Sequence, residues 1–270
     1  MHYTPDLATH VLAETDLVLK RTEPDIIKVD LLWNTLAFFR ANVLAILLRN
    51  TIGPKVYSGP FKGMSLTPAV MVKTFGPVLT GCYEHELHET FEKIIPQPYA
   101  RILNIGCAFG YYSTGLALRM PGIPIEAFDI SVDEQKRCHD MAVLNGVQDR
   151  IKVGGEFRGE DFAAYADQKT LLLVDIEGAE TTLLDPERYP ALKQMDVIVE
   201  LHDLFDATIS KTITARFAPT HDIEIIRNRS TLFDFTAITG EASYTDPFDG
   251  LIITWERRDG PTPWAVMRAR

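Results

Sequence analysis

Residues 101–118 read RILNIGCAFGYYSTGLAL, and this stretch decides the fold. The first five residues form an apolar run of the length expected for a buried strand. A turn that carries Gly106 and Gly110 follows, and an apolar pattern with helical spacing begins at Tyr112. A strand that passes through a glycine turn into a helix is typical of a βαβ unit in a parallel sheet.

The chain downstream repeats this alternation of short apolar runs and helical patterns. The apolar runs are IEAFDI, IKV, TLLLVDI and DVIVEL, and further helices are predicted from Val132 and Ala179. Ser131 and Glu134 form a capping box at the start of the first of these helices, and Gly146 is placed to end it. The alternation predicts right-handed crossovers and a sheet covered on both faces.

Two later runs, 222–226 and 251–255, lack a long crossover between them, so we expect them to pair antiparallel at the end of the sheet. The fold class is therefore predicted as α/β, a Rossmann-like sheet that is mostly parallel with an antiparallel last strand. Residues 1–95 are predicted as a mainly helical extension or lid with a short hairpin around Val56, and residues 96–270 as the ligand-binding domain.

The most hydrophobic stretch, residues 31–48, has apolar residues at helical spacing. Asn34, Arg40 and Asn42 interrupt it, so we expect no membrane span. An amphipathic helix of this kind is expected to cover its own domain or a twin subunit, which makes a homodimer one of the predicted assemblies.

Composition narrows the classes of function. Of 270 residues, 46% are hydrophobic and 24% charged, which are ordinary values for a globular protein, and the formal net charge is −10. An acidic chain is poorly suited to bind nucleic acid or an anionic membrane, so neither is expected as a partner. The three cysteines match no disulfide or zinc spacing, and no secretion signal is visible, so a cytoplasmic location is expected.

The glycine turn is better suited to a nucleoside than to a dinucleotide. A dinucleotide fingerprint requires a G-x-G-x-x-G spacing, whereas Ala108 holds the second glycine position here. Asp129 ends the second strand, 23 residues after Gly106, where a carboxylate can accept hydrogen bonds from both ribose hydroxyls. Glu156, in the GGEF turn after the third strand, is a candidate acceptor for an adenine amino group.

At these residues the chain resembles class I S-adenosylmethionine-dependent methyltransferases, and the FkbM-like group in particular. The resemblance covers about residues 55–255 and is carried in order by GCYEHELHE, NIGCAFGYYSTGLAL, AFDIS, VDIEGAE and VELHD. It implies S-adenosyl-L-methionine as the cofactor, with Asn104 in place of the customary acid before the loop. The residues expected to contact this cofactor are Tyr83, Asn104, Gly106, Cys107, Ala108, Gly110, Asp129, Ile130, Glu156 and Asp175.

Acidic residues follow the fourth and fifth strands, in VDIEGAE and VELHD. Ligands of open α/β sheets bind at the carboxyl edge, and an oxygen-rich set of ligands suits Mg²⁺. We therefore expect Asp175, Glu200 and Asp203 to form a magnesium site. In the alternative interpretation, Glu200 and Asp203 cap the next helix and Asp175 only orients the loop after it.

His202 is the first candidate for a general base, because imidazole titrates near neutral pH and this residue lies beside the proposed ligands. Asp175 is the second catalytic candidate. His85, His88 and His221 are alternatives, with His221 expected at the active edge, and each is more simply explained as a packed histidine. Glu177 and Glu180 are left unassigned.

These features together predict a methyltransferase for a small hydroxylated or amine-bearing metabolite in a biosynthetic pathway. O-methylation is slightly preferred, because a cation and a histidine base are both most useful on a hydroxyl. Two alternatives stay open: a nucleoside-binding module without catalysis, and a metal-dependent glycosyltransferase or hydrolase. The acceptor pocket is expected between the extension and residues 230–250.

Overall fold

The computed structural model describes residues 5–70, 75–239, 247–258 and 260–270. Its centre is a seven-stranded sheet with the order β3-β2-β1-β4-β5-β7-β6, in which β7 alone runs antiparallel to its neighbours. The strands are β1 Arg101–Ile105, β2 Ile125–Phe128, β3 Ile151–Gly154, β4 Thr170–Val174, β5 Asp196–Glu200, β6 His221–Ile226 and β7 Trp264–Ala269. The Rossmann-like sheet predicted from the sequence is confirmed.

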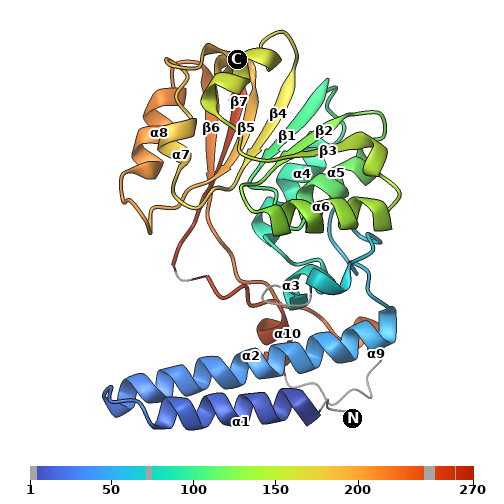
Figure 1. Cartoon of the computed structure of the whole chain (residues 1–270), viewed down its shortest axis with the longest axis vertical. Coiled ribbons are helices and arrows are strands. Elements are labelled where there is room, and N and C mark those ends of the chain that lie inside the picture. Colours follow the sequence, from blue (N-terminus) through green and yellow to red (C-terminus); the bar gives the residue numbers. More distant parts are fainter. Residues whose placement is uncertain (1–4, 71–74, 240–246, 259) are drawn as a thin grey trace.

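Helices cover the sheet on both faces (Figure 1). The helices are α1 Pro5–Leu19, α2 Asp25–Ile52, α3 Phe75–Thr80, α4 His88–Ile94, α5 Tyr111–Arg119, α6 Val132–Leu144, α7 Glu180–Leu183, α8 Ile209–Phe217, α9 Thr236–Thr239 and α10 Pro247–Ile253. On one face, α4, α5 and α6 share a hydrophobic cluster with Ile102 and Ile198. On the other, α8 packs through Phe217 against Leu172 and Val197.

The central strands owe their place to continuous apolar sequence. All five residues of β4 are buried, because a parallel strand in mid-sheet has helices on both sides. The helix after β2 begins as predicted, since the Ser131 hydroxyl accepts a hydrogen bond from the Glu134 amide at 3.4 Å. Gly146 follows the end of α6 with a φ of 67°, which confirms the predicted stop.

The antiparallel last strand is confirmed, but its predicted position at residues 251–255 was wrong. Residues 251–253 belong to helix α10, and the strand that completes the sheet is β7, which pairs with both β5 and β6. A short apolar run such as GLII fits a buried helix as well as a strand. Pro247 at the first helical position and Asp249 in the first turn favour the helix. β6 begins one residue before the predicted start.

The N-terminal residues form a long helical hairpin, α1 and α2, below the carboxyl edge of the sheet (Figure 1). α3 and α10 lie between α2 and the sheet, and Leu44 and Leu48 of α2 join the same hydrophobic cluster as the sheet. The expected hairpin appears as a single antiparallel bridge between Lys55 and Ser65. The division at residue 95 stays a prediction.

Helix α2 extends well beyond the predicted 31–48. Among the described residues, it is the one helix long and apolar enough to cross a membrane by length and composition, and 28% of its most apolar window is buried in the protein. Arg40, in its middle, donates to the buried carboxylate of Asp249 in α10 at 2.8 Å.

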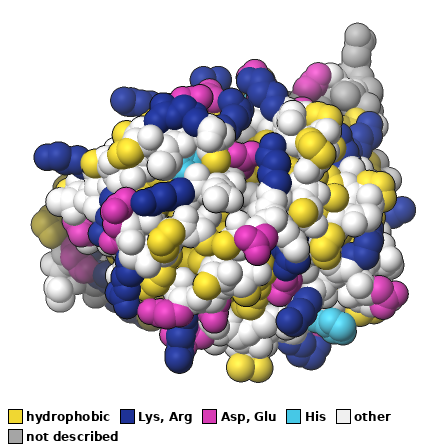
Figure 2. Space-filling view, turned by 90° about the horizontal axis from the view of Figure 1, so that it is seen from above, with side chains coloured by type: hydrophobic (Ala, Val, Ile, Leu, Met, Phe, Trp, Pro, Cys, Tyr) yellow, Lys and Arg dark blue, Asp and Glu magenta, His cyan; other side chains and the backbone are white. Residues whose placement is uncertain are grey.

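Figure 2 shows the molecule from above with respect to Figure 1. On this face, Lys and Arg side chains are mixed with Asp and Glu side chains.

Candidate functional site

The carboxyl ends of β1, β2, β4 and β5 bring the predicted site residues to one edge of the sheet. The amides of Gly106 and Cys107 both donate to the Phe128 carbonyl, at 2.8 and 2.9 Å, and thereby fasten the turn after β1 to the end of β2. The Asp175 amide donates to the Ile105 carbonyl at 3.0 Å, so the loop after β4 begins beside the same turn.

Glycines in this turn are required by packing inside the protein. Gly106 has a φ of 81°, and a Cβ built on it would lie 1.7 Å from the Asp175 carbonyl oxygen. Gly110 has a φ of 83°, and its Cβ would meet the Cys138 sulfur at 2.8 Å. Ala108 adopts a φ of 43° and faces solvent. The accessible surface of the turn is therefore formed by Ala108 and by parts of Gly106 and Phe109.

Asp129 holds the turn in place from the end of β2. One carboxylate oxygen accepts from the Ala108 amide at 3.0 Å, and the other accepts from the Ser131 amide at 2.8 Å. Each oxygen retains a lone pair, because a carboxylate has about four acceptor positions. Beside it, the Ile130 side chain is 83% exposed. The turn, Asp129 and Ile130 thus form one accessible surface.

The other residues expected at the cofactor differ in where their side chains lie. The buried side-chain amide of Asn104 donates to the Ser113 hydroxyl at 2.8 Å, and the Cys107 side chain lies in the hydrophobic core. Glu156 is exposed and pairs with Arg158 at 2.8 Å. The ring of Tyr83 packs edge-on against Tyr111, with centroids 5.3 Å apart. Asn104 and Cys107 therefore present no side chain to the surface of the turn, because each side chain points into the protein.

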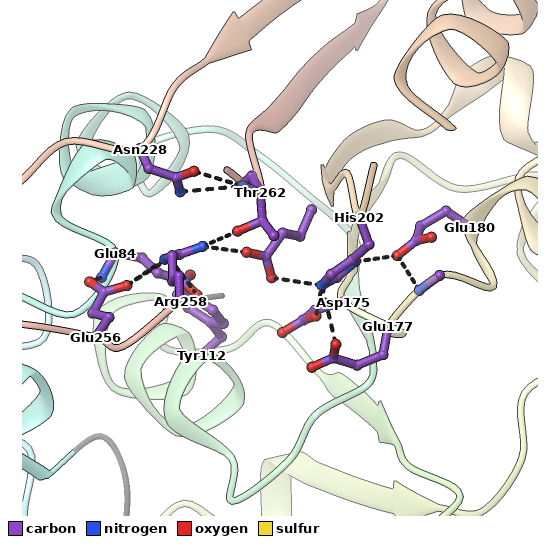
Figure 3. Close-up of polar contacts among 12 residues, drawn as sticks. Glu84, Tyr112, Asp175, Glu177, Glu180, His202, Asn228, Glu256, Arg258 and Thr262 are labelled. Carbon is purple, nitrogen blue, oxygen red and sulfur yellow. Dashed lines mark hydrogen bonds and ion pairs between the residues drawn. The ribbon is translucent and has the colours of Figure 1, made fainter. Parts of the chain in front are cut away.

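Asp175, Glu200 and His202 meet where β4 and β5 end. Ligand atoms from all three lie within 4.8 Å of one another. The Nε2 atom of His202 is 3.6 Å from Asp175 Oδ1 and 3.5 Å from Glu200 Oε2 (Figure 3). Asp175 Oδ1 is buried and has no hydrogen-bond partner among the residues that the structure describes. Two carboxylates and an imidazole at these separations can hold either a proton or a metal ion.

Glu180 fixes the orientation of His202. Its fully buried carboxylate lies 2.5 Å from His202 Nδ1 and also accepts from the Gly178 amide at 3.1 Å. The Nδ1 contact directs Nε2 toward Asp175 and Glu200. Metal-ligating histidines commonly have a carboxylate on the second ring nitrogen, so this arrangement is compatible with a metal site.

Asp203 does not join this cluster, so the expected set of Asp175, Glu200 and Asp203 is wrong in its third member. The Asp203 carboxylate accepts from the amide and the hydroxyl of Ser210, at 2.8 and 2.6 Å, and caps the first turn of α8. The Asp203 side chain is therefore bound to the start of the following helix. His202 takes the third position, and a mixed set of nitrogen and oxygen ligands suits Mn²⁺ or Zn²⁺ as well as Mg²⁺.

The charges in this cluster set the protonation state of His202. Burial alone would lower its pKa, but the hydrogen bond to Glu180 and the charges of Glu200 and Asp175 outweigh burial and raise the pKa to about 9. Burial and the Glu200 charge also raise the pKa of Asp175 well above its usual range. At neutral pH the His202 imidazole therefore already carries the proton that a general base would take.

Arg258 is a central residue that sequence reasoning missed. Its guanidinium contacts four carboxylates, with Glu256 at 2.7 Å, Glu84 at 3.4 Å, Glu86 at 3.6 Å and the closest contact to Glu200. Burial raises the pKa of Glu84 well above its ordinary value, and that of Glu256 to a smaller extent. One arginine cannot neutralise four carboxylates, so this region attracts positively charged groups.

Three alternative histidines have structural surroundings. His221 Nε2 donates to the Met195 carbonyl at 2.8 Å, and the residue lies where β6 begins. Since β6 runs parallel to β5, this is the edge opposite Glu200, so the expectation that His221 lies at the active edge is wrong. The rings of His85 and His88 pack together with centroids 4.7 Å apart, and burial, the largest cause, lowers the pKa of His88 to about 4.

Comparison with known proteins gives no family model that matches and no curated protein that matches. Among solved structures, the chain is similar to the O-methyltransferase TomG from Streptomyces achromogenes, involved in tomaymycin synthesis and in complex with SAM. The identity is 14%, with 86% of this chain and 98% of that chain covered and a TM-score of 0.49.

Two further solved structures resemble the chain. An O-methyltransferase from Bacillus cereus in complex with SAH is 11% identical, with 86% and 90% of the two chains covered and a TM-score of 0.44. Precorrin-6y C5,15-methyltransferase from Geobacter metallireducens GS-15 is 12% identical, with 67% and 85% covered and a TM-score of 0.47. The fold itself rests on the strand order described above.

Proposed function

We propose that this chain is an S-adenosylmethionine-dependent methyltransferase that acts on a small acceptor, of the FkbM-like kind its motifs resemble. The observation that carries the proposal is the Gly106–Gly110 turn held by the Asp129 carboxylate at the carboxyl edge of β1 and β2. A carboxylate in this place offers acceptor positions to ribose hydroxyls, and Ala108 stands where a dinucleotide fingerprint has the glycine that admits a pyrophosphate.

Charge at the site favours the same donor. Four carboxylates form ion pairs with Arg258, and the carboxylates of Asp175 and Glu177 lie near His202. A sulfonium and an ammonium are attracted to such a region, whereas the phosphates of a nucleotide sugar or a dinucleotide are repelled. The acidic surroundings therefore support a phosphate-free adenosine cofactor.

The reaction requires alignment of the acceptor behind the sulfonium methyl group, which can supply on the order of 7 to 11 kcal/mol. We assign removal of the acceptor's proton to Asp175, with the charged His202 imidazole beside it. The charged His202 imidazole favours the ionised form of the Asp175 carboxylate, which can then take a proton from an acceptor hydroxyl. A hydroxyl acceptor is preferred over an amine on this ground. Residues 240–246, within the expected acceptor pocket, lie outside the described residues.

Asp175, Glu200 and His202 would also hold a divalent cation. The buried Asp175 Oδ1 atom, which accepts no hydrogen bond from the described residues, and the carboxylate on His202 Nδ1 both fit this role. A bound cation would lower the pKa of an acceptor hydroxyl.

The cation proposal predicts that a chelator abolishes methyl transfer while binding of S-adenosylhomocysteine is unchanged. Glu200→Gln should weaken Mn²⁺ binding by at least tenfold in a calorimetric titration, since one ligand loses its charge. Asp203→Asn is the matched control, because its side chain is bound to Ser210, and it should bind Mn²⁺ like the unmodified chain. Full activity in excess chelator would show that methyl transfer does not require a cation.

Methyl transfer itself is tested by incubating the chain with radiolabelled S-adenosylmethionine and a small-molecule extract. Label in a new small product supports the proposal. Donor binding without transfer under any acceptor mixture would indicate a binding module, and cleavage or transfer of a nucleotide sugar would indicate a glycosyltransferase or hydrolase.

A further inference from the structure

The first half of α2 carries an exposed apolar stripe. Ile26 is 73% exposed, Val29 60%, Trp33 63% and Leu36 50%. Their spacing of three, four and three residues places them on one face of the helix. Single exposed apolar side chains are common, but four in sequence along one face indicate a surface that another molecule covers.

Helix α1 repeats the feature. Leu12 and Leu19 are 71% and 55% exposed and lie seven residues apart, on one face, while Val11 and Val18 are buried. The buried pair lies on the inner side of the hairpin that α1 forms with α2. The apolar surface of α1 therefore exceeds what its partner helix can cover.

The second half of α2 limits the choice of occupant. Leu44 and Leu48 are buried in the core that includes the sheet, so α2 cannot enter a bilayer as a spanning helix without leaving this core. Residues 5–52 contain five Lys or Arg and six Asp or Glu. A helix that lies on an anionic membrane surface is rich in Lys and Arg, and this hairpin is not.

The amount of exposed apolar surface suits a protein interface. Full burial removes about 100 Å² from water for an aliphatic side chain and about 200 Å² for an aromatic one. The six exposed side chains named above would therefore bury on the order of 400 to 500 Å² per copy. A standard interface buries about 800 Å² per partner, so these residues would supply its apolar centre.

We propose that a second copy of this chain covers these faces, so that two α1–α2 hairpins pack into a helical bundle. Two-fold symmetry lets one apolar face serve both partners, and a helical hairpin with surplus apolar surface is completed by another hairpin of the same kind. This proposal is independent of the proposed methyl transfer.

Sedimentation or light scattering tests it on the full chain. The unmodified chain should have twice the 30.3 kDa mass of one copy at micromolar concentration. Ile26→Asp with Trp33→Asp should be monomeric, with an unchanged circular dichroism spectrum, because both side chains already face solvent in one copy. Leu144→Asp, at a 49% exposed residue of α6, is the matched control and should stay dimeric. A monomeric unmodified chain, or a dimer that survives the double substitution, would overturn the proposal.

Trp33 supplies a second readout in case the double variant does not fold. Dilution should shift the tryptophan emission of the unmodified chain to longer wavelength, as Trp33 returns to water. Trp33→Phe keeps an apolar ring, so it should remain dimeric and lose the shift. A shift that persists in Trp33→Phe contradicts the assignment, as does a chain that sediments with phosphatidylserine vesicles and does not self-associate.

Discussion

The orientation and charge of His202 depend on the carboxylates that surround it. Its sequence neighbours suggest a base at the end of β5, and the structure confirms its place beside Asp175 and Glu200. Glu180 could not be assigned from sequence, because its direction depends on the turn at Gly178 and on a helix α7 of only four residues. Arg258 could not be found either, since the four carboxylates that it contacts are far apart in the chain or belong to a polar segment, WERRDG.

Glu180→Gln should lower the pKa of His202 from about 9 toward its ordinary value near 6.5, since the amide keeps the contact to Nδ1 but removes the charge. An NMR titration of the His202 ring in metal-free protein measures this. Glu177→Gln is the control, because Glu177 is 75% exposed at its side chain and should have a smaller effect. Equal shifts in the two variants would show that Glu180 does not set the pKa.

The same group links stability to pH. The folded-state pKa of His202 lies above its unfolded value, so its stabilisation is complete below about pH 6.5 and is lost as pH rises through about 9. The loss is on the order of 3 kcal/mol. Urea unfolding across this range, with chelator present, should show the decline, and Glu180→Gln should flatten it. A stability that rises over this range would contradict the assignment.

Among the elements, the strands that could be predicted are not limited to those buried on both faces, because β4 is fully buried whereas β2 and β3 each have partly exposed residues. The runs that became β1 to β5 are short, apolar and bounded by turns, so their positions follow from sequence. The run at 251–253 has the same character, but its packing against α2 and α3 makes it a helix. Asp203 shows a similar limit at the site. The sequence predicts that its carboxylate lies near the carboxyl edge of the sheet, but it does not predict the direction in which the side chain points.

Gly146 and Gly106 both adopt a positive φ, so substitutions at these two glycines distinguish the cost of backbone strain from the cost of a steric clash. Gly146→Ala should cost about 1 kcal/mol, because its φ is 67° and the space around it is open. Gly106→Ala adds a Cβ 1.7 Å from the Asp175 carbonyl oxygen, so it should cost about 4 kcal/mol or more. Urea unfolding of both variants measures the difference. Equal losses would show that the turn after β1 is not packed against the end of β4.

At the scale of the whole molecule, Arg258 joins three parts of the chain. Glu84 and Glu86 belong to the N-terminal segment, Glu200 ends β5, and Glu256 precedes β7. The site is therefore assembled from segments that lie more than 170 residues apart, and its formation depends on the complete fold.

Arg258→Met should destabilise the chain by about 3 to 5 kcal/mol in mildly alkaline buffer, because buried carboxylates lose their cation. The loss should shrink in mildly acidic buffer, since Glu84 and Glu256 have raised pKa values and become neutral as pH falls. Arg257→Met is the control: Arg257 is exposed and lies over the Phe38 ring at 4.3 Å, so a small, pH-independent loss is expected. A similar pH dependence in both variants would exclude the charge cluster as the cause.

Calorimetric titration with S-adenosylhomocysteine measures whether Asp129 and the turn after β1 bind an adenosine without a pyrophosphate. We expect the unmodified chain to bind S-adenosylhomocysteine and Asp129→Ala to bind it about 10- to 100-fold more weakly, a loss of about 1 to 3 kcal/mol. Ser131→Ala, which removes only the helix cap, should leave affinity unchanged. Unchanged affinity in Asp129→Ala, or binding of a dinucleotide or nucleotide sugar in place of S-adenosylhomocysteine, would contradict this expectation.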